Sequence, residues 1–535
     1  MKKLFLLRSV VLGAMFLVGL SANAQGFRNP VINADVPDNT LCRVGDYYYM
    51  VSTTMHLMPG GPVMRSKDLK TWETVSYIFD RIDDGDRYNL IDGKTVYGQG
   101  QWASSLRYYF GKFYLWFTTN GSRNGFLYSA EKAEGPWKLV CRPPHFHDSS
   151  FFVDDDGRVY MFYGTGDAVE LTRAVLDETG KVWGEEAILR RFKVPVRDGI
   201  ENGLLEGNNM MKVNGKYYLL MISWPRGRVR REVCYRAESV DGPWEKKIIL
   251  DNALAPFNGG GVAQGGIVDA PDGQWHGIFF QDRYGVGRVP CYVPCRWEDG
   301  WPILGDADGK VQDDVNAKYI HQTGILGSDE FTSEKLSLYW EWNHNPIDDA
   351  WSLSERPGYL RMKTNRVVDN IYVAPNTITM RMEGPKCTGT VCLDVSNMQD
   401  GDKCGFSAFC GKSGVLCISK VGKNLTLVME EQDLKLNRQH AVDQVEVNQQ
   451  GETIKINPKK PVYLRVNGDF TDGRDIATFA YSLDGKKFLP IGGEMKMKFD
   501  TGTFFMGTKF AIFNYATKSV GGYIDVDWFH FDHEG

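Results

Sequence analysis

Short runs of aromatic and β-branched residues alternate with glycine-bearing polar turns over the first two-thirds of the chain. One phrase recurs there: a polar turn with glycine, an aromatic-rich run, a second run, and a later run that carries tryptophan. The turn glycines of its five copies lie 46 to 66 residues apart and are Gly45, Gly111, Gly157, Gly215 and Gly273. In the last three copies an Asp-Gly or Asn-Gly pair separates two strand-like runs, which is the strongest short signal of a β-hairpin.

A repeat of this length fits one blade of a β-propeller, which holds a few short strands. Five copies therefore predict a five-bladed β-propeller over residues 25–325. A β-helix would need shorter coils, and a sandwich would not repeat the Gly-Pro-Trp endings at 135–137 and 242–244.

From Ser328 onward the pattern loses this period. Strand-like runs follow at 336–342, 351–362, 391–395, 406–410, 415–421, 425–429, 461–466, 477–481, 510–515 and 522–531. Strands with turns every ten or so residues are typical of a β-sandwich. The sequence thus predicts an all-β protein, with the propeller followed by a β-sandwich over 326–535 and a boundary near residue 325.

The first residues have the pattern of a targeting segment. Two lysines precede an apolar run over 10–20, and an Ala-Asn-Ala site follows at 22–24. A charged start, an apolar stretch and a small-x-small site indicate a signal peptide over 1–24. An uncleaved anchor is the alternative, but the apolar run is shorter than the ~20 residues that a spanning helix needs. We expect an exported protein without a membrane span, in the periplasm rather than secreted.

Size, charge and cysteine content further limit the class of protein to which the chain can belong. A chain of 535 residues exceeds what one hydrophobic core usually supports, so two or more domains are expected. Its 62 Lys+Arg and 67 Asp+Glu give a net charge of −5 without a basic block, so we expect no nucleic-acid partner. The ten cysteines include no C-x-x-C pair with a matching pair of histidines, which argues against structural zinc. We interpret them as buried free thiols rather than disulfides.

Three acidic residues hold matching places in three copies of the repeat. Asp38, Asp148 and Glu206 each precede a turn glycine by seven to nine residues. Because the inner strands of a propeller converge on one central depression, we expect these carboxylates to meet there. A solvated turn carboxylate or a capping residue is the structural alternative for each one. Together they favour hydrolysis of a glycosidic bond, which needs one ionised and one protonated carboxyl group at the same pH.

The segments around these residues resemble glycoside hydrolase family 43. The opening stretch 29–48, with Asn29-Pro30 and Pro37-Asp38, is similar to the first motif of the family, and the segments around Asp148 and Glu206 are similar to its second and third motifs. The stretches 264–269 and 287–290 are also similar. The segment 340–359 resembles the start of the appended, concanavalin-like sandwich of its β-xylosidase-like members.

The resemblance implies an inverting mechanism on a five-bladed propeller, with a role for each carboxylate. It implies that Asp38 is the general base, that Glu206 is the general acid, and that Asp148 orients this acid and modulates its pKa. An inverting pair leaves room for a water between base and acid. Asp35, three residues before Asp38, is an alternative base.

The family prolines that usually follow these carboxylates are absent. Asn39, Ser149 and Asn208 stand in their places, so we expect the stiffness of the three loops to differ from that in the family.

Further residues are candidates for substrate or metal binding. By the resemblance, Arg288 is expected to hold sugar hydroxyls and Trp102 to form a wall for the sugar; a surface ion pair and core packing are their alternatives. His56 and Trp224 are pocket candidates, with packing as the alternative for both. Gln264 stands where the family often has a histidine, in a stretch that can line a central water or calcium site.

No cofactor is required by this chemistry, and calcium is the expected ion if a structural one is bound. Glu330 and Asp527, in the acidic pairs near the two ends of the sandwich, are its weak candidate ligands, because calcium prefers oxygen ligands. A surface pair is the alternative.

These observations predict an exo-acting glycosidase whose partner is an oligosaccharide substrate. The resemblance is to exported bacterial α-L-arabinofuranosidases, including those that act on arabinose-decorated xyloglucan, so we expect release of terminal α-L-arabinofuranose from plant cell-wall oligosaccharides. A β-D-xylosidase is the alternative within the class. A catalytically inactive sugar-binding propeller, or a structural propeller that carries a glycan-binding sandwich, are alternatives of other classes.

Overall fold

The computed structural model describes residues 26–178, 182–196, 203–251, 260–306, 308–311 and 317–534. The predicted signal peptide lies outside them. The described residues contain no α-helix; their helical segments are short 3-10 turns, η1 (Asp86–Asn89), η2 (Ile91–Gly93), η3 (Arg173–Leu176), η4 (Glu185–Ala187), η6 (Tyr284–Val286), η7 (Asp348–Ala350), η8 (Ile371–Val373) and η9 (Thr471–Gly473). The prediction of an all-β protein is confirmed.

Strands of the first three hundred residues form five antiparallel sheets of four strands each in the described part of the chain. These blades are, from inner to outer strand, β1 (Thr40–Val44), β2 (Tyr47–Val51), β4 (Gly60–Ser66) and β5 (Glu73–Phe79); β6 (Gln101–Tyr109), β7 (Lys112–Thr119), β8 (Gly125–Ala130) and β9 (Lys138–Cys141); β10 (Ser150–Val153), β11 (Val159–Tyr163), β12 (Asp167–Leu171) and β13 (Ile188–Lys193); β14 (Leu204–Val213), β15 (Lys216–Trp224), β16 (Arg231–Ala237) and β17 (Glu245–Leu250); and β18 (Ala263–Asp269), β19 (Trp275–Arg283), β20 (Gly287–Glu298) and β21 (Trp301–Leu304).

The five turn glycines all lie in the hairpin between the first and second strand of a blade. Each has a positive φ, between 60° and 83°. An L-residue with a side chain rarely adopts this backbone region, whereas glycine enters it without steric cost. The glycine spacing therefore predicted the five-bladed propeller correctly, because each copy of the hairpin needs the same residue at the same place.

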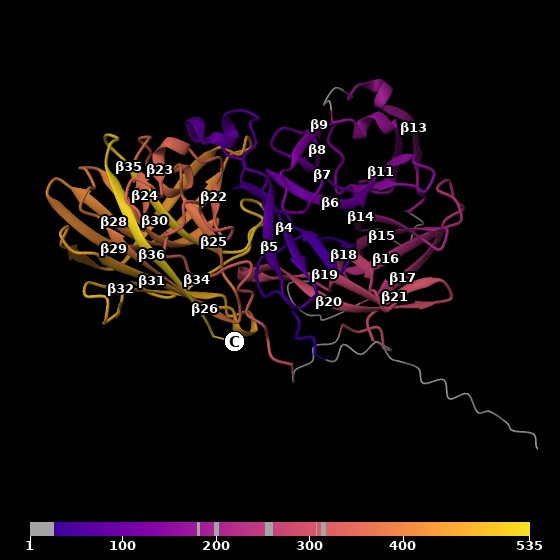
Figure 1. The fold of residues 1–535 in the computed structure, drawn as a ribbon. Helices are drawn as coiled ribbons and strands as arrows, with labels where there is room; N and C mark the ends of the chain where they lie inside the picture. Colours follow the sequence, from indigo (N-terminus) through magenta and orange to yellow (C-terminus); the bar gives the residue numbers. More distant parts are fainter. Residues whose placement is uncertain are drawn as a thin grey trace, which may run out of the picture.

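Two further sheets of eight strands each pack into a concanavalin-like sandwich (Figure 1). The first has the order β3-β22-β25-β35-β27-β28-β29-β30, and the second has the order β23-β24-β36-β26-β31-β32-β33, with β34 beside β32. Their strands are β3 (Leu57–Met58), β22 (Glu341–Asn343), β25 (Ile378–Arg381), β35 (Lys509–Ala516), β27 (Asp402–Phe409), β28 (Lys412–Val421), β29 (Asn424–Leu436), β30 (Val442–Ile456), β23 (Trp351–Ser352), β24 (Leu360–Lys363), β36 (Tyr523–Glu534), β26 (Lys386–Asp394), β31 (Val462–Asp469), β32 (Ile476–Ser482), β33 (Leu489–Pro490) and β34 (Met495–Lys496).

Strand β30 is the clearest departure from the predicted runs. It is 15 residues long, but most of its side chains are exposed or half-buried, since it forms the free edge of its sheet. A search for apolar runs misses such a strand, because its hydrogen-bonded pairing with β29 defines it and not an apolar pattern of its own. The predicted run 351–362 is in fact two short strands, β23 and β24, joined by a turn.

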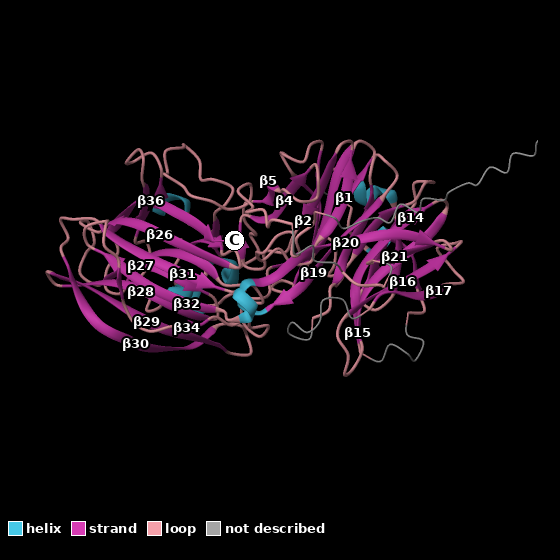
Figure 2. Ribbon diagram, turned by 90° about the horizontal axis from the view of Figure 1, so that it is seen from below, coloured by secondary structure: helices cyan, strands magenta, loops and turns pink. Residues whose placement is uncertain are grey.

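The propeller and the sandwich are joined by more than the connecting chain. Strand β3, an excursion from the first blade, pairs with β22 of the sandwich through Met58 and Trp342. One hydrophobic cluster also runs from propeller residues such as Trp72 into sandwich residues such as Leu393. Figures 1 and 2 show the two bodies side by side, with β4 and β5 facing the sandwich. The sandwich thus braces the first blade, which carries Asp38.

All ten cysteines are free, and nine of them are buried, so the prediction of buried thiols is confirmed apart from the half-buried Cys42. In the described residues we find no helix with the length and apolarity needed to cross a bilayer.

Candidate active site

Two of the three acidic residues occupy the same strained place at the start of an inner strand. Asp38 and Asp148 lie two residues before β1 and β10, and both have positive φ, 53° and 44°. Asp tolerates this region better than most residues do. Glu206 lies in β14 at a bulge and precedes Gly207, whose φ is 67°. A side chain at Gly207 would meet Gln264 and Ile222 at 2.9 Å. The bulge therefore sets the direction of the glutamate.

These three carboxylates meet in one basin. The charge of Glu206 contributes to the raised pKa values of both Asp148 and Asp38, and the charge of Asp38 contributes to that of Asp148. Asp38 and Asp148 line the same small cavity at the centre of the propeller. The expectation that separate blades bring these acidic residues together agrees with this geometry.

Asp38 is held by one cation and one hydroxyl. Arg288 Nη1 lies 2.8 Å from one carboxylate oxygen, and the Thr53 hydroxyl donates to the other at 2.7 Å. Asp38 and Arg288 are both buried. Burial raises the pKa of Asp38, while Arg288 and Thr53 act against this shift and the charge of Glu206 adds to it.

Asp148 lies beside Glu206 with little compensating charge. Burial and then the charge of Glu206 raise the pKa of Asp148 to about 7, and His147 acts in the opposite direction. The His147 Nε2 atom lies 3.0 Å from Glu206 Oε2 and 3.9 Å from Asp148 Oδ1. The side chain of Glu206 is 23% exposed, so its carboxyl group can reach a bound molecule.

Aromatic rings wall the basin. The Trp102 ring is 5.7 Å from the His147 ring and 5.8 Å from that of Phe505. Phe505 comes from the sandwich, between β34 and β35, and its ring stacks under the Arg288 guanidinium at 4.4 Å. Its carbonyl accepts from Arg288 Nη2 at 3.3 Å. Aromatic walls beside polar groups suit sugar rings, which have apolar faces and hydroxyl edges.

Gln264 lines the central cavity, whereas Trp224 lies at an exposed strand end. Gln264 lines the cavity with Asp38 and Asp148, and its backbone N–H donates to Glu232 at 2.9 Å. Trp224 is 38% exposed at the end of β15, opposite Leu204 and two residues past the partner of Glu206. The Arg230 guanidinium lies 5.5 Å from its ring.

His56 lies in the interface between the domains. Its side chain is fully buried, and its ring packs against Tyr97, His344 and Phe504 at 4.6 to 5.4 Å. This is the packing alternative and not a sugar contact, because no surface of the ring is open to a ligand.

Asp35, the alternative base, is fully engaged elsewhere. Its two carboxylate oxygens accept from the backbone N–H groups of Arg288 and Gly507, both at 2.9 Å, and Lys509 Nζ is 3.7 Å away. Its side chain is 2% exposed. Asp35 therefore ties the propeller to the sandwich and has no oxygen facing the basin.

The polar residues at the family proline positions make loop contacts of their own. Asn208 Nδ2 donates to the carbonyls of Asp148 and Gly164, both at 2.9 Å. Asn39 Nδ2 donates to the Val36 carbonyl at 2.8 Å. Side-chain hydrogen bonds thus restrain two of the loops that proline would otherwise stiffen.

An arginine also lines the cavity at the propeller centre. Arg107 lines the same cavity as Asp38 and Asp148, and its Nη2 donates to Asn209 Oδ1 at 2.8 Å and to Ser150 Oγ at 2.9 Å. The inner strands β6, β10 and β14 are therefore tied together by one guanidinium group. No periodic pattern in the sequence singles out this residue.

Two groups of side chains in the described residues have the composition of a metal site. The first is His147, Asp148 and Glu206 in the basin. The second is His321, Glu383 and His533 at the contact between connector and sandwich, where Tyr319 and the Gln322 N–H already donate to Glu383 Oε1. The group in the basin is the one that contacts candidate catalytic residues.

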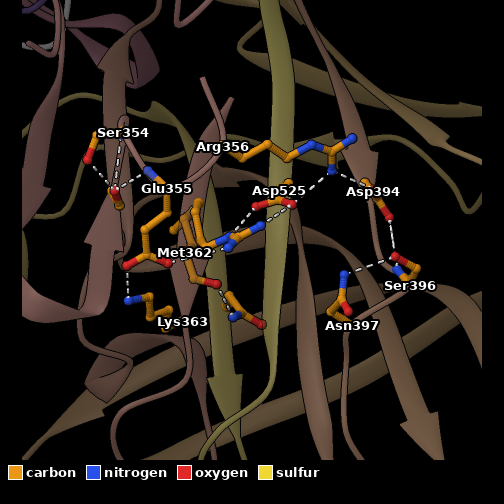
Figure 3. Close-up of polar contacts among 12 residues, drawn as sticks. Ser354, Glu355, Arg356, Met362, Lys363, Asp394, Ser396, Asn397 and Asp525 are labelled. Carbon is orange, nitrogen blue, oxygen red and sulfur yellow. Dashed lines mark hydrogen bonds and ion pairs between the residues drawn. The ribbon is translucent and has the colours of Figure 1, made fainter. Parts of the chain in front are cut away.

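The candidate calcium ligands have other partners. Glu330 Oε1 lies 2.7 Å from His530 Nε2, and Asp527 Oδ2 accepts from the Cys392 thiol at 3.8 Å. Neither belongs to a group of three ligand-type side chains within the described residues. Asp525, two residues before Asp527, is bound by the guanidinium groups of Arg356 and Arg361 at 2.8 to 3.0 Å (Figure 3). The positive charge at this place comes from arginine.

Sequence reasoning did not single out His147 or Phe505. His147 directly precedes Asp148, and this adjacency to a predicted site residue could have indicated it. Phe505 lies about 400 residues after Trp102 in the chain, and only the packing of the two domains brings it to the basin.

The comparisons with known proteins agree with this arrangement. A profile described as "Glycosyl hydrolases family 43" matches residues 27–302, and one described as "Beta xylosidase C-terminal Concanavalin A-like domain" matches residues 328–532. A protein named "Beta-xylosidase" from Formosa agariphila is 29% identical, over 95% of this chain and 90% of its own. "Non-reducing end alpha-L-arabinofuranosidase BoGH43B" of Bacteroides ovatus is 28% identical, over 74% of this chain and 76% of its own.

Solved structures show the same architecture. A "Bifunctional GH43-CE" chain of Bacteroides eggerthii is 39% identical, with a TM-score of 0.85, over 95% of this chain and 64% of its own. A GH43 glycoside hydrolase with an engineered active site, described as displaying both endo-xylanase and exo-arabinofuranosidase activity, is 29% identical, with a TM-score of 0.84, over 95% of this chain and all of its own.

Proposed function

Because the chain belongs to glycosyl hydrolase family 43 and is an exo-glycosidase of its xylosidase and arabinofuranosidase group, we propose that it releases terminal α-L-arabinofuranose from plant cell-wall oligosaccharides with inversion of configuration. The observation that carries this proposal is the meeting of Asp38, Asp148 and Glu206 in one walled basin. Arabinose-decorated xyloglucan is the parent polymer we propose, and export to the periplasm is the location.

Each carboxylate has a proposed role that follows from its surroundings. Asp38 is the general base: Arg288 and Thr53 hold its ionised form in place to take a proton from the attacking water. Glu206 is the general acid, because it is the more exposed group and can reach the departing oxygen. Asp148 orients Glu206, since the two charges repel and cannot both be ionised without cost.

The proposed reaction uses side chains of this chain and one water molecule. Water attacks the anomeric carbon and gives its proton to Asp38 while Glu206 protonates the leaving oxygen, and the bond between the anomeric carbon and that oxygen breaks. Trp102 and Phe505 exclude bulk water from one side of the sugar. Arg288, whose second nitrogen contacts the Phe505 carbonyl, is proposed to hold both the base and a sugar hydroxyl.

A parallel assay tests this proposal. The purified protein is incubated with an aryl α-L-arabinofuranoside and an aryl β-D-xyloside, and with arabinose-decorated xyloglucan oligosaccharides. We expect faster release from the arabinofuranoside, with the β-anomer of arabinose appearing first in the proton NMR spectrum. Glu206→Gln is the matched control and should lose activity on the oligosaccharides. Equal rates for this variant and the wild type would show that the acid is wrongly assigned.

A β-D-xylosidase is the second candidate, favoured by the name of the Formosa agariphila relative, which matches 95% of this chain. The same assay separates the two, since faster release of xylose would select this function. An inactive sugar-binding propeller predicts binding of oligosaccharide without release of either pentose.

A further inference from the structure

His147 connects the two carboxylates of the acid side of the basin, and the mechanism above gives it no role. Its Nε2 atom makes a 3.0 Å hydrogen bond with Glu206 Oε2 and lies 3.9 Å from Asp148 Oδ1. Among the described residues, neither an arginine nor a lysine forms an ion pair with Glu206, whereas His147 does. The imidazole is therefore the cationic partner that this carboxylate has there.

The ring is fixed on one side and open on the other. The His147 carbonyl accepts from Gly164 N–H at 2.7 Å, and its ring leans on Trp102 at 5.7 Å and stacks with His145 at 6.1 Å. Its side chain is nevertheless 35% exposed. One ring edge thus meets the catalytic acid while another part of the ring meets solvent.

We propose that His147 is a positioning residue that holds Glu206 and returns the catalytic proton to it after each turnover. This inference rests on the proposed function, because it assigns Glu206 as the general acid. It adds a route by which that acid is recharged.

The proton balance of this route is simple. Before the reaction the pair holds one proton, which passes from His147 Nε2 to Glu206 Oε2 as the N–H bond breaks and an O–H bond forms. The leaving oxygen takes this proton, so that a carboxylate and a neutral imidazole remain. The lone pair of the imidazole is then on Nε2, which regains a proton from water or from a buffer acid, since both side chains are partly exposed. Asp38 meanwhile gives the proton it took from the attacking water back to solvent, so both carboxyl groups return to their starting states.

The charges around His147 favour its protonated form. Burial opposes it, but the hydrogen bond with Glu206 and the charges of Asp148, Glu206 and Asp38 together raise the pKa of His147 to about 9. The pKa of the neighbouring His145 is lowered, mainly by burial and then by the charges of His147 and Arg123. The pair of His147 and Glu206 therefore keeps one proton well above the pH at which an isolated carboxyl group would lose it.

The variant His147→Gln tests this pairing, because an amide can still donate to Glu206 but cannot carry a proton. On an unactivated oligosaccharide we expect its kcat/KM at pH 7 to fall about tenfold, and on an activated aryl glycoside, whose leaving group needs little protonation, less than about twofold. The alkaline limb of the pH profile should move to lower pH by about 1 unit. A folded variant with the wild-type limb and the wild-type ratio of the two substrates overturns the proposal.

His145→Gln is the matched control. It replaces the histidine two residues away, which bonds Asn120 at 2.7 Å and has no contact with Glu206, so we expect the wild-type profile. A limb that moves as far in this variant as in His147→Gln would mean that a general charge effect, and not the pairing, sets the profile. Thermal unfolding of both variants identifies any that fail to fold.

A measurement on the wild-type protein depends on no variant and on no activity. NMR titration of the imidazole rings should show one histidine that keeps its proton above pH 8. Loss of this proton near pH 6.5 overturns the inference. If the wild type releases no pentose from either glycoside, the proposed function fails, and this titration still decides whether His147 and Glu206 share a proton.

Discussion

The basin and the arginine cluster of the sandwich treat buried carboxylates in opposite ways. In the cluster, Asp525 is 1% exposed and is bound by both Arg356 and Arg361, while Arg356 also bonds Asp394 at 2.7 Å (Figure 3). Burial works against the ionised form of Asp394, yet Ser396 and Arg356 lower its pKa overall. In the basin, Asp38 has one arginine, and Asp148, which shares a histidine with Glu206 and accepts from the Gly207 backbone, has a raised pKa.

The difference shows that the arginine cluster serves stability, whereas the basin serves chemistry. Paired charges hold β24, β26 and β36 together, and they have no oxygen left for a ligand. The basin instead leaves Asp148 with too little positive charge, so that its carboxyl group can gain or lose a proton near neutral pH. Perturbed titration of this kind marks functional sites, although structural networks also produce it. The surplus of negative charge is a cost in stability that the rest of the fold offsets.

The largest effect is expected for Asp38→Asn, which removes the base but keeps its shape. Without a group that accepts the proton of the attacking water, kcat should fall about 10³-fold. The measurement is the initial rate of pentose release at pH 6. A variant that keeps the wild-type rate would show that another residue is the base.

Asp525→Ala should leave the reaction intact and weaken the fold. Removal of the anion leaves two guanidinium groups without their shared partner, and breaking a buried pair costs about 3 kcal/mol in the free energy of unfolding. Urea unfolding measures this cost, and kcat of the folded enzyme should stay within about twofold of the wild type. A stability equal to that of the wild type would mean that the cluster contributes little.

Asp148→Asn should stabilise the fold above neutral pH, whereas Asp525→Ala destabilises it. The native pKa of Asp148, about 7, lies above its unfolded value, so its contribution to stability is present at acid pH and is lost as the pH rises through 7. The variant has no such loss. We expect it to gain on the order of 2 kcal/mol relative to the wild type between pH 4.5 and pH 7.5, while activity falls. Parallel unfolding curves at the two pH values would contradict the raised pKa.

The smallest effect is expected for Glu355→Gln, at the exposed margin of the arginine cluster. Glu355 is 40% exposed and pairs with Lys363 and with Arg361 at 3.3 Å. Solvent screens such pairs, so the free energy of unfolding should change by less than about 0.5 kcal/mol. This variant serves as the control for Asp525→Ala. A loss as large as that of the alanine variant would mean that the network acts as one unit.

Much of the fold follows from local sequence features. A glycine with positive φ at each hairpin gave the number of blades, and the alternation of apolar runs gave most sandwich strands. The edge strand β30 escaped because its side chains face solvent on both sides. The acidic residues of the site were also accessible to sequence reasoning, since the inner strand of each blade leads to the same axis.

The sequence by itself determined the fold class, the blade repeat and three acidic residues at matching places, because each depends on a few neighbouring residues. The tertiary structure alone decided which acidic residues stay available. Asp35 and Asp38 are three residues apart, yet one is bound to the sandwich and the other faces the basin. It also decided that His56 packs in an interface while Phe505 reaches the site. Charge compensation and burial depend on residues hundreds of positions away, and no local pattern carries that information.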